Sequence, residues 1–228
     1  MSAPNQVLVF DMDGVLVDVA NSYREAIVRT VEIFTGKVIS RDLIQEYKNQ
    51  GGWNNDWLLS QKICRDLGVE VDYETIVDHF MDLFLNQGLI HRERWIPSPT
   101  LLDKLSEKSE LAIFTGRNTL EATITLEREG LMDRFLLVTS DDVEREKPFP
   151  DGLLKIAKLR PGKRMVYVGD TVDDLRCANA ANVPFIGIAA QNSPRREELI
   201  ALFQAEGAIQ ILDDVNEIVG HALACPPN

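Results

Sequence analysis

Two carboxylates stand two residues apart in the segment Asp11-Met12-Asp13-Gly14, directly after the apolar run at residues 7–10. A carboxylate can attack phosphorus and form an aspartyl-phosphate, so Asp11 is a candidate nucleophile. A second carboxyl group could protonate the leaving oxygen and then act as a base toward water, which makes Asp13 a candidate acid and base. This pair therefore predicts the transfer of a phosphoryl group from an ester to water.

Charged or hydroxyl-bearing residues also follow the next three apolar runs: Thr115, Gly116 and Arg117 after 111–114, Lys147 beyond 136–138, and Asp170 and Asp174 after 165–168. In open α/β sheets, ligands bind at the carboxyl ends of the strands, so we expect these groups to meet at one edge. A single Asp after a strand is often only a helix cap, but four groups in this order are hard to explain by capping alone.

A cation is needed because carboxylates crowded around a phosphate would otherwise repel it. Asp11, Asp170 and Asp174 offer the oxygen ligands that Mg²⁺ prefers. Lys147 would balance the charge of Asp11 and of the phosphate as a compact point charge. We therefore predict Mg²⁺ as the cofactor and Lys147 as a catalytic residue.

The segment Thr115-Gly116-Arg117 supplies candidate ligands for the phosphate and the substrate. The Thr115 hydroxyl and the Gly116 amide could each donate a hydrogen bond to a phosphate oxygen. Arg117 could contact the substrate or the phosphate, or it could be a surface arginine at the start of a helix.

The apolar runs indicate the elements that position these groups: residues 7–10, 111–114, 136–138, 165–168, 184–189 and 209–212. Short, continuous apolar runs are typical of parallel strands that are covered on both faces. Amphipathic stretches with helical spacing lie between the runs from residue 101 onward. Strands that alternate with helices predict an α/β fold with a doubly wound parallel sheet.

Residues 19–93 break this alternation. They contain no convincing strand and predict helices at about 20–34, 41–48, 56–67 and 73–89. The chain is expected to return to the sheet near Pro97 and Pro99, because proline cannot continue a helix. We therefore predict a core domain of residues 1–18 and 94–228, covered by a helical cap domain of residues 19–93.

These dispersed motifs resemble those of the haloacid dehalogenase (HAD) superfamily. The resemblance is to members with a helical cap between the first two motifs, such as phosphoglycolate phosphatases and β-phosphoglucomutase-like proteins. It implies a Rossmann-like core, with Asp11 as nucleophile, Asp13 as acid and base, and Thr115 and Lys147 on the phosphate. It also implies a metal site formed by Asp11, Asp170, Asp174 and the backbone carbonyl of Asp13. The implied activity is hydrolysis of a small soluble phosphorylated metabolite.

Three alternatives to a phosphatase exist within the superfamily. Dehalogenases lack an acid two residues after the nucleophile, where this chain has Asp13. Phosphomutases of the β-phosphoglucomutase type carry a histidine in the first cap helix, where this chain has Tyr23. A mutase could hold a second phosphate with cap cations, but their helical spacing is more typical of a solvated face; these are Arg24, Arg29, Lys37, Arg41 and Lys48. A non-catalytic ligand-binding protein is disfavoured because the catalytic acids are present.

Substrate specificity is expected from the loop between two cap helices. Its residues Gly52, Trp53, Asn54 and Asn55 combine flexible backbone, a large apolar face and amide groups. We predict that they contact the leaving group. The alternative interpretation is that Asn54 or Asn55 only caps the helix that follows.

Composition limits the partners. The chain of 228 residues has a formal net charge of -12, so neither nucleic acid nor an anionic membrane is an expected partner. The three cysteines are widely spaced and indicate neither a disulfide framework nor a zinc site. With no signal peptide and no apolar run long enough for a bilayer, we expect a cytoplasmic protein. The exact substrate and the oligomeric state stay open at this point.

Overall fold

A six-stranded sheet forms the centre of the molecule, which the computed structural model describes for residues 4–220. The strand order is β5-β4-β1-β6-β7-β8, and every neighbouring pair is parallel. The predicted doubly wound α/β sheet is therefore confirmed. The strands are β1 (Gln6–Phe10), β4 (Glu110–Phe114), β5 (Leu136–Val138), β6 (Arg164–Gly169), β7 (Phe185–Ile188) and β8 (Gln210–Leu212).

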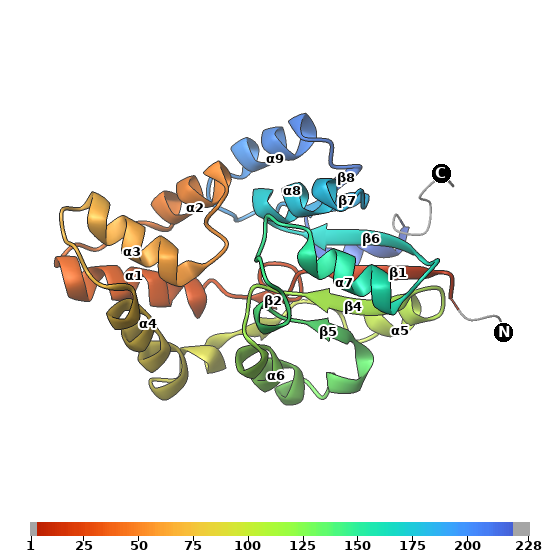
Figure 1. Cartoon of the computed structure of the whole chain (residues 1–228), viewed down its shortest axis with the longest axis horizontal. Helices are drawn as coiled ribbons and strands as arrows, with labels where there is room; N and C mark the ends of the chain where they lie inside the picture. The colour runs from red at the N-terminus through yellow and green to blue at the C-terminus, as the bar shows by residue number, and fades with distance from the viewer. Residues whose placement is uncertain (1–3, 221–228) are drawn as a thin grey trace.

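Both faces of this sheet are covered, which explains the continuous apolar runs. All five residues of β1 are buried. Leu8 and Phe10 belong to one hydrophobic cluster, whereas Val7 and Val9 belong to another on the opposite face. The covering helices, visible in Figure 1, are α5 (Leu101–Ser106), α6 (Thr119–Arg128), α7 (Asp151–Leu159), α8 (Val172–Ala180) and α9 (Arg196–Ala205). Short turns lie at η3 (Met132–Arg134), η4 (Ser140–Asp142) and η5 (Val215–Gly220).

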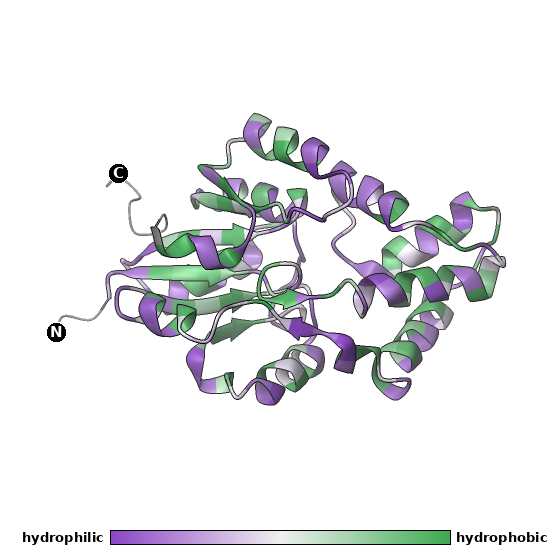
Figure 2. Ribbon diagram, turned by 180° about the vertical axis from the view of Figure 1, so that it is seen from behind, coloured by the Kyte–Doolittle hydropathy of each residue, from purple (hydrophilic) through white to green (hydrophobic). Residues whose placement is uncertain are grey.

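Residues 19–93 form a group of helices, hereafter the helical block, which lies beyond the carboxyl ends of the central strands (Figure 1). Its elements are α1 (Tyr23–Thr35), α2 (Arg41–Gln50), α3 (Asp56–Asp66), α4 (Tyr73–Met81), the π-helical η1 (Asp82–Asn86) and the 3₁₀ turn η2 (Leu89–Arg92). The predicted helix at 73–89 is thus divided. In Figure 2 the central strands are coloured mostly hydrophobic, whereas the helices carry both hydrophobic and hydrophilic residues.

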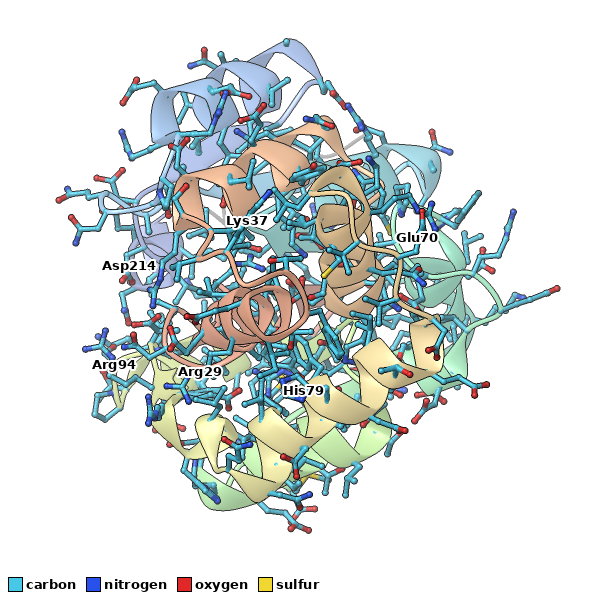
Figure 3. All side chains as sticks on the ribbon, turned by 90° about the vertical axis from the view of Figure 1, so that its left-hand side faces the viewer. Arg29, Lys37, Glu70, His79, Arg94 and Asp214 are labelled. Carbon is cyan, nitrogen blue, oxygen red and sulfur yellow. The ribbon has the colours of Figure 1, made fainter. Side chains whose placement is uncertain are left out.

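Lys37 and Glu70 are exposed on the outer face of the helical block, as seen end-on in Figure 3. The exposed side chains of the block also include the apolar Ile33, Val38 and Leu58. None of the helices among residues 4–220 combines the length and the apolar character that a membrane span requires.

The two chain crossings between sheet and helical block pair with each other. Strand β2 (Val17–Asp18) runs antiparallel to β3 (Arg94–Trp95), and the side chains of Asp18 and Arg94 form an ion pair. Sequence patterns did not predict this ribbon, because strands of two residues carry no detectable periodicity.

Candidate active site

Asp11 and Lys147 form the centre of the site. Asp11 follows β1 directly, and its backbone N–H donates to the carbonyl of Val168 on the neighbouring strand. Lys147 Nζ lies 2.7 Å from Asp11 Oδ1 and 2.8 Å from Asp174 Oδ1. All three side chains are buried. The structure thus brings together groups that the sequence holds far apart.

Three aspartates gather at this edge of the sheet. One carboxylate oxygen from each of Asp11, Asp170 and Asp174 lies within 4.8 Å of the others. Asp174 is fixed at the start of α8, where it forms a capping box with Thr171 and accepts a hydrogen bond of 2.6 Å from the Tyr167 hydroxyl. Its location therefore follows from the local capping of α8.

Gly14 gives Asp170 its space. Gly14 has a φ of 75°, and a Cβ on it would lie 1.9 Å from Asp170 Oδ2. A side chain at this position would therefore both strain the backbone and displace the carboxylate.

The charges in the cluster are not balanced by protein groups alone. Burial, with Asp174 and Asp13 nearby, raises the pKa of Asp11 to about 7 against the opposing effect of Lys147. Burial, with Asp11 and Asp174 nearby, raises the pKa of Asp170 well above its usual range. Burial also opposes ionisation of Asp174, but Lys147 and the hydrogen bonds from Thr171 and Tyr167 together outweigh it and lower that pKa. One lysine among three acids leaves room for a hard cation with oxygen ligands, so the residues fit a divalent metal.

The Asp13 carboxylate does not belong to the three-aspartate cluster and is held by Arg117. Arg117 Nε donates to Asp13 Oδ1 at 2.8 Å, and Nη2 donates to the same oxygen. The predicted contact of Arg117 with substrate or phosphate stays a prediction. The alternative of an exposed surface arginine is wrong, because Arg117 is only 2% exposed.

Thr115 and Gly116 lie at the end of β4. The hydroxyl oxygen of Thr115 accepts the backbone N–H of Arg117 at 3.1 Å. Asn54 reaches from the helical block to Gly116, where an added Cβ would stand 2.5 Å from Asn54 Nδ2. The absence of a side chain at Gly116 therefore allows the loop of the helical block to reach the sheet edge.

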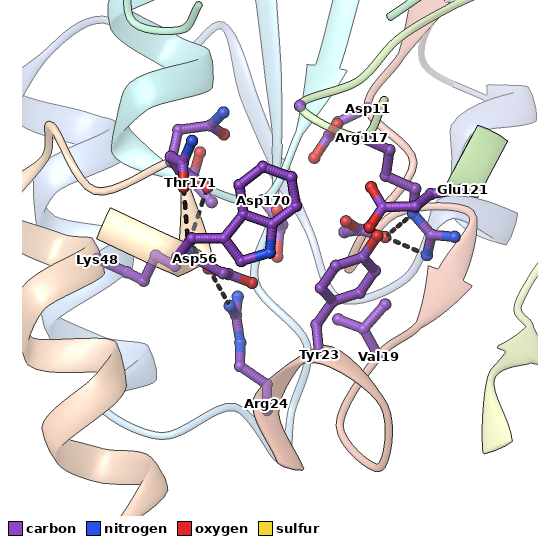
Figure 4. Close-up of a pocket in the computed structure, with 15 residues that line it drawn as sticks. Asp11, Val19, Tyr23, Arg24, Lys48, Asp56, Arg117, Glu121, Asp170 and Thr171 are labelled. Atoms are coloured by element: carbon purple, nitrogen blue, oxygen red, sulfur yellow. Dashed lines mark hydrogen bonds and ion pairs between the residues drawn. The ribbon is translucent and has the colours of Figure 1, made fainter. Parts of the chain in front are cut away.

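A cavity of about 60 Å³ separates the sheet edge from the helical block. Figure 4 shows Tyr23, Arg117 and Glu121 grouped on one side of it, and Lys48 and Asp56 on the other. Of the predicted site residues, those that line it are Asp11, Asp13, Asn54, Asn55, Gly116, Arg117 and Asp170. The remaining lining residues are Val19, Tyr23, Arg24, Lys48, Asp56, Trp57, Glu121 and Thr171.

The solvated-face interpretation of Arg24 and Lys48 is wrong. Lys48 is 5% exposed and its Nζ lies 2.6 Å from Asp56 Oδ1, while Arg24 Nη1 lies 3.5 Å from the same oxygen. A helical pattern separates apolar from polar faces, but it does not reveal a buried polar pocket. The sequence did contain one sign that Lys48 is buried. Lys48 lies four residues after the buried Ile44 and therefore on the same face of α2.

Only part of the loop predicted to contact the leaving group lines the cavity. Asn54 and Asn55 line the cavity, whereas Gly52 and Trp53 do not. The backbone N–H groups of Gly52 and Trp53 instead donate to the Asp173 carboxylate, at 2.7 and 3.1 Å. Asn55 also caps α3, because its side-chain Oδ1 accepts hydrogen bonds from the backbone N–H groups of Trp57 and Leu58 in the first turn of that helix.

Glu121 and Tyr23 are two further polar residues that line the cavity, and the sequence did not indicate them as site residues. Burial raises the pKa of Glu121 to about 7, although Arg117 lowers it. The Tyr23 hydroxyl lies beside the Glu121 carboxyl, and a hydrogen bond between them also lowers the pKa of Glu121 against the effect of burial.

Comparison with known proteins assigns this site to a family. Residues 8–188 match the model of the haloacid dehalogenase-like hydrolases. The chain belongs to the haloacid dehalogenase-like hydrolase family. The match spans the segments that carry Asp11, Lys147 and Asp174, so the whole acidic cluster lies within it.

Individual relatives have low sequence identity to this chain. An imidazoleglycerol-phosphate dehydratase from Phytophthora nicotianae is 28% identical over 96% of this chain, which spans only 50% of that protein. A phosphoglycolate phosphatase from Agrobacterium fabrum is 24% identical, with 79% of this chain and 78% of that protein covered. A hydrolase structure from Pseudomonas syringae aligns with a TM-score of 0.73 and 21% identity, covering 97% and 99% of the two chains. At that identity, the structural likeness supports the fold alone.

Proposed function

We propose that this chain is a Mg²⁺-dependent phosphomonoester hydrolase that uses Asp11 as its nucleophile. The observation that carries the proposal is the meeting of Asp11, Lys147, Asp170 and Asp174 at one buried edge of the sheet. Membership of the hydrolase family and the phosphoglycolate phosphatase relatives support it. The substrate in this proposal is a small soluble phosphorylated metabolite.

In the first half of the reaction, a carboxylate oxygen of Asp11 attacks the phosphorus atom. The bond between phosphorus and the ester oxygen breaks, and Asp13 gives its proton to that leaving oxygen. The alcohol departs, and the phosphoryl group remains on Asp11. Lys147, 2.7 Å from Asp11 Oδ1, balances the negative charge at the attacking carboxylate.

In the second half, the Asp13 carboxylate takes a proton from a water molecule whose oxygen attacks phosphorus. The bond between phosphorus and Asp11 breaks, which releases inorganic phosphate and restores both carboxyl groups. Mg²⁺, held by Asp11, Asp170, Asp174 and the Asp13 carbonyl, would supply positive charge that allows the phosphate to approach these acids. Thr115 and the Gly116 amide are proposed to contact the phosphate oxygens.

Residues 19–93 would act as a cap domain over a core domain of 1–18 and 94–228. The cavity of about 60 Å³ is small, so it favours a phosphate with a small leaving group. Asn54, Asn55 and Arg117 line it and would contact that group, with Gly52 and Trp53 supporting the loop. Such a metabolite is consistent with action in the cytoplasm, without nucleic acid or membrane partners.

The test is a phosphatase screen over a panel of phosphate esters, with Mg²⁺ and with EDTA. The panel includes phosphoglycolate and imidazoleglycerol phosphate, which the names of two relatives contain. We expect Mg²⁺-dependent turnover that Asp11→Asn abolishes and that Asp133→Asn, an exposed acid on η3, preserves. Binding of an ester with no turnover by the wild type would instead indicate a non-catalytic protein.

A phosphomutase is the second candidate, and one observation favours it. Arg24 and Lys48 line the cavity and could hold a second phosphate, although Asp56 already pairs with both. Tyr23 occupies the place of the mutase histidine, and burial raises its pKa well above the usual range, so it transfers protons poorly near neutral pH. Conversion of a hexose 1-phosphate to its 6-phosphate, rather than to free sugar, would favour the mutase.

A further inference from the structure

Arg117 connects the candidate acid and base with the helical block. It follows β4 on the sheet edge, and its guanidinium is buried. Besides its two hydrogen bonds to Asp13, it donates from Nη2 to Glu93 Oε1 at 2.8 Å and from Nη1 to Thr125 Oγ1 at 2.9 Å. Its Cζ also lies 4.9 Å from the centre of the Tyr23 ring.

Arg117 contacts only one of the two carboxyl oxygens of Asp13. Arg117 Nε and Nη2 converge on Oδ1, so the second carboxyl oxygen, Oδ2, is not engaged by Arg117. Asp13 itself lines the cavity. A carboxyl group held through one oxygen presents the other in a fixed direction, which is what proton transfer to a leaving oxygen requires.

Arg117 is itself fixed from two directions by the helical block. Glu93 is the residue before β3, where the chain returns to the sheet, and its side chain is fully buried. Thr125 Oγ1 donates to Glu93 Oε2 at 2.8 Å, and Arg128 Nη2 donates to the same oxygen at 3.1 Å. Tyr23, on α1, lies over the guanidinium from the other crossing. The orientation of Asp13 is thus tied to both crossings of the chain.

We propose that Arg117 is a positioning residue that aims the Asp13 carboxyl at the leaving oxygen and does so only when the helical block is in place. This inference rests on the proposed phosphatase function. Displacement of the block would move Glu93 and Tyr23, release the guanidinium and leave Asp13 free to rotate. The same network would thereby couple closure over the substrate to the orientation of the acid.

The network is an unusual means of merely holding the fold together. Burying charged groups is costly, and apolar side chains of similar size commonly stabilise a core as well or better. Here two acids and two arginines are arranged so that one acid still faces the cavity. An orienting role explains why Arg117, rather than an apolar residue, stands behind Asp13.

Leaving-group dependence provides the test, because a misaimed acid matters most when the leaving oxygen needs a proton. We compare kcat/KM, which covers the steps through release of the alcohol, for an alkyl phosphate and for 2,4-dinitrophenyl phosphate, whose phenolate leaves without protonation. Arg117→Lys keeps the charge but cannot form both bonds to one oxygen. We expect it to lower kcat/KM by about 30-fold on the alkyl ester, and by less than about 3-fold on the aryl ester. The first factor is smaller than the roughly 10²–10⁴-fold that general acid catalysis contributes, because a misaimed acid keeps part of its effect.

Arg128→Ala is the matched control. Arg128 donates to Glu93 and to the carbonyl of Ile90 but does not contact Asp13. Its loss leaves the hydrogen bonds from Arg117 to Glu93 and to Asp13 in place, so any fall in kcat/KM should be by similar factors for both esters. Arg117→Ala, checked by circular dichroism, gives a second reading in case the lysine finds a new route to Asp13.

Two failures are distinguishable. If the wild type hydrolyses neither ester, the proposed function is wrong. If the wild type hydrolyses both, and folded Arg117 variants lose the same factor on both, Arg117 is only structural and the inference is overturned. Glu93→Gln adds a further check, because it should shift the ratio between the two esters in the same direction as Arg117→Lys.

Discussion

Asp173 Oδ1, at the start of α8, accepts the backbone N–H of Gly52 at 2.7 Å and so connects the sheet-covering helix α8 to the helical block. The other carboxylate oxygen accepts the N–H of Trp53. Asp173 is 1% exposed, and this side chain faces the loop rather than the three-aspartate cluster. The loop that carries Asn54 and Asn55 into the cavity is therefore held by an acid that does not belong to the proposed chemistry.

Asp173→Asn should loosen this loop. An amide offers one acceptor oxygen where the carboxylate offers two, and hydrogen bonds to a charged acceptor contribute about 1.5–3 kcal/mol. We expect kcat/KM to fall about 10-fold, mostly through KM, and the Gly52 and Trp53 amides to exchange hydrogen faster in mass spectrometry. Unchanged exchange at these two amides would contradict the role, and Asp133→Asn serves as the control.

Gly14→Ala should damage the metal site specifically. The new Cβ would lie 1.9 Å from Asp170 Oδ2, and the backbone φ of 75° disfavours any side chain. Gly36→Ala is the control for the backbone effect alone, because Gly36 has a φ of 69° and an added Cβ would have nothing within 4 Å. Both variants should lose roughly 1–2 kcal/mol of folding free energy, but Gly14→Ala alone should lose Mg²⁺ affinity in calorimetry. Equal Mg²⁺ affinity in the two variants would contradict the prediction.

Glu121→Gln should change how stability depends on pH. Burial raises the pKa of Glu121 from 4.5 to about 7. Between these values the folded protein retains a proton that the unfolded chain has released, so this residue makes folding less favourable as pH rises from about 4.5 to 7. Glutamine keeps the capping box of α6 and does not titrate.

Urea denaturation at pH 5 and pH 8 measures this effect. The variant should gain stability relative to the wild type at pH 8, by an amount on the order of 3 kcal/mol at most, and little at pH 5. A constant difference between wild type and variant at both values would indicate that Glu121 has an ordinary pKa.

Much of the fold was predictable because burial on both faces leaves a strong signal in the sequence. The apolar run before Asp11 became β1, and the run before Asp170 became β6. The known rule that ligands bind at the carboxyl ends of parallel strands then brought Asp11, Lys147 and Asp170 to one place. That inference needs only the strand order and direction, not the side-chain contacts.

The other half of the cavity was not predictable in the same way. Tyr23, Lys48 and Glu121 come from three helices, and their approach depends on how the helical block is seated on the sheet. Periodicity reports how polar a face is, but not whether another polar face covers it. Lys48 illustrates the problem, because a lysine on a polar helix is usually solvated and here is paired with Asp56.

Removal of Mg²⁺ should lower stability in a way that depends on Asp170. The pKa values of Asp11 and Asp170 are raised because burial and neighbouring acids oppose their ionisation, so a cation that binds only the folded protein should stabilise it. At Mg²⁺ concentrations about 100 times the Kd, the gain is about 2.7 kcal/mol. Asp170→Asn removes one of the repelling acids, so without Mg²⁺ its Tm should equal or exceed that of the wild type. On addition of Mg²⁺, the Tm measured by calorimetry at matched ionic strength should rise for the wild type and for Asp133→Asn but not for Asp170→Asn. An equal rise in the Tm of Asp170→Asn would show that the cation binds elsewhere.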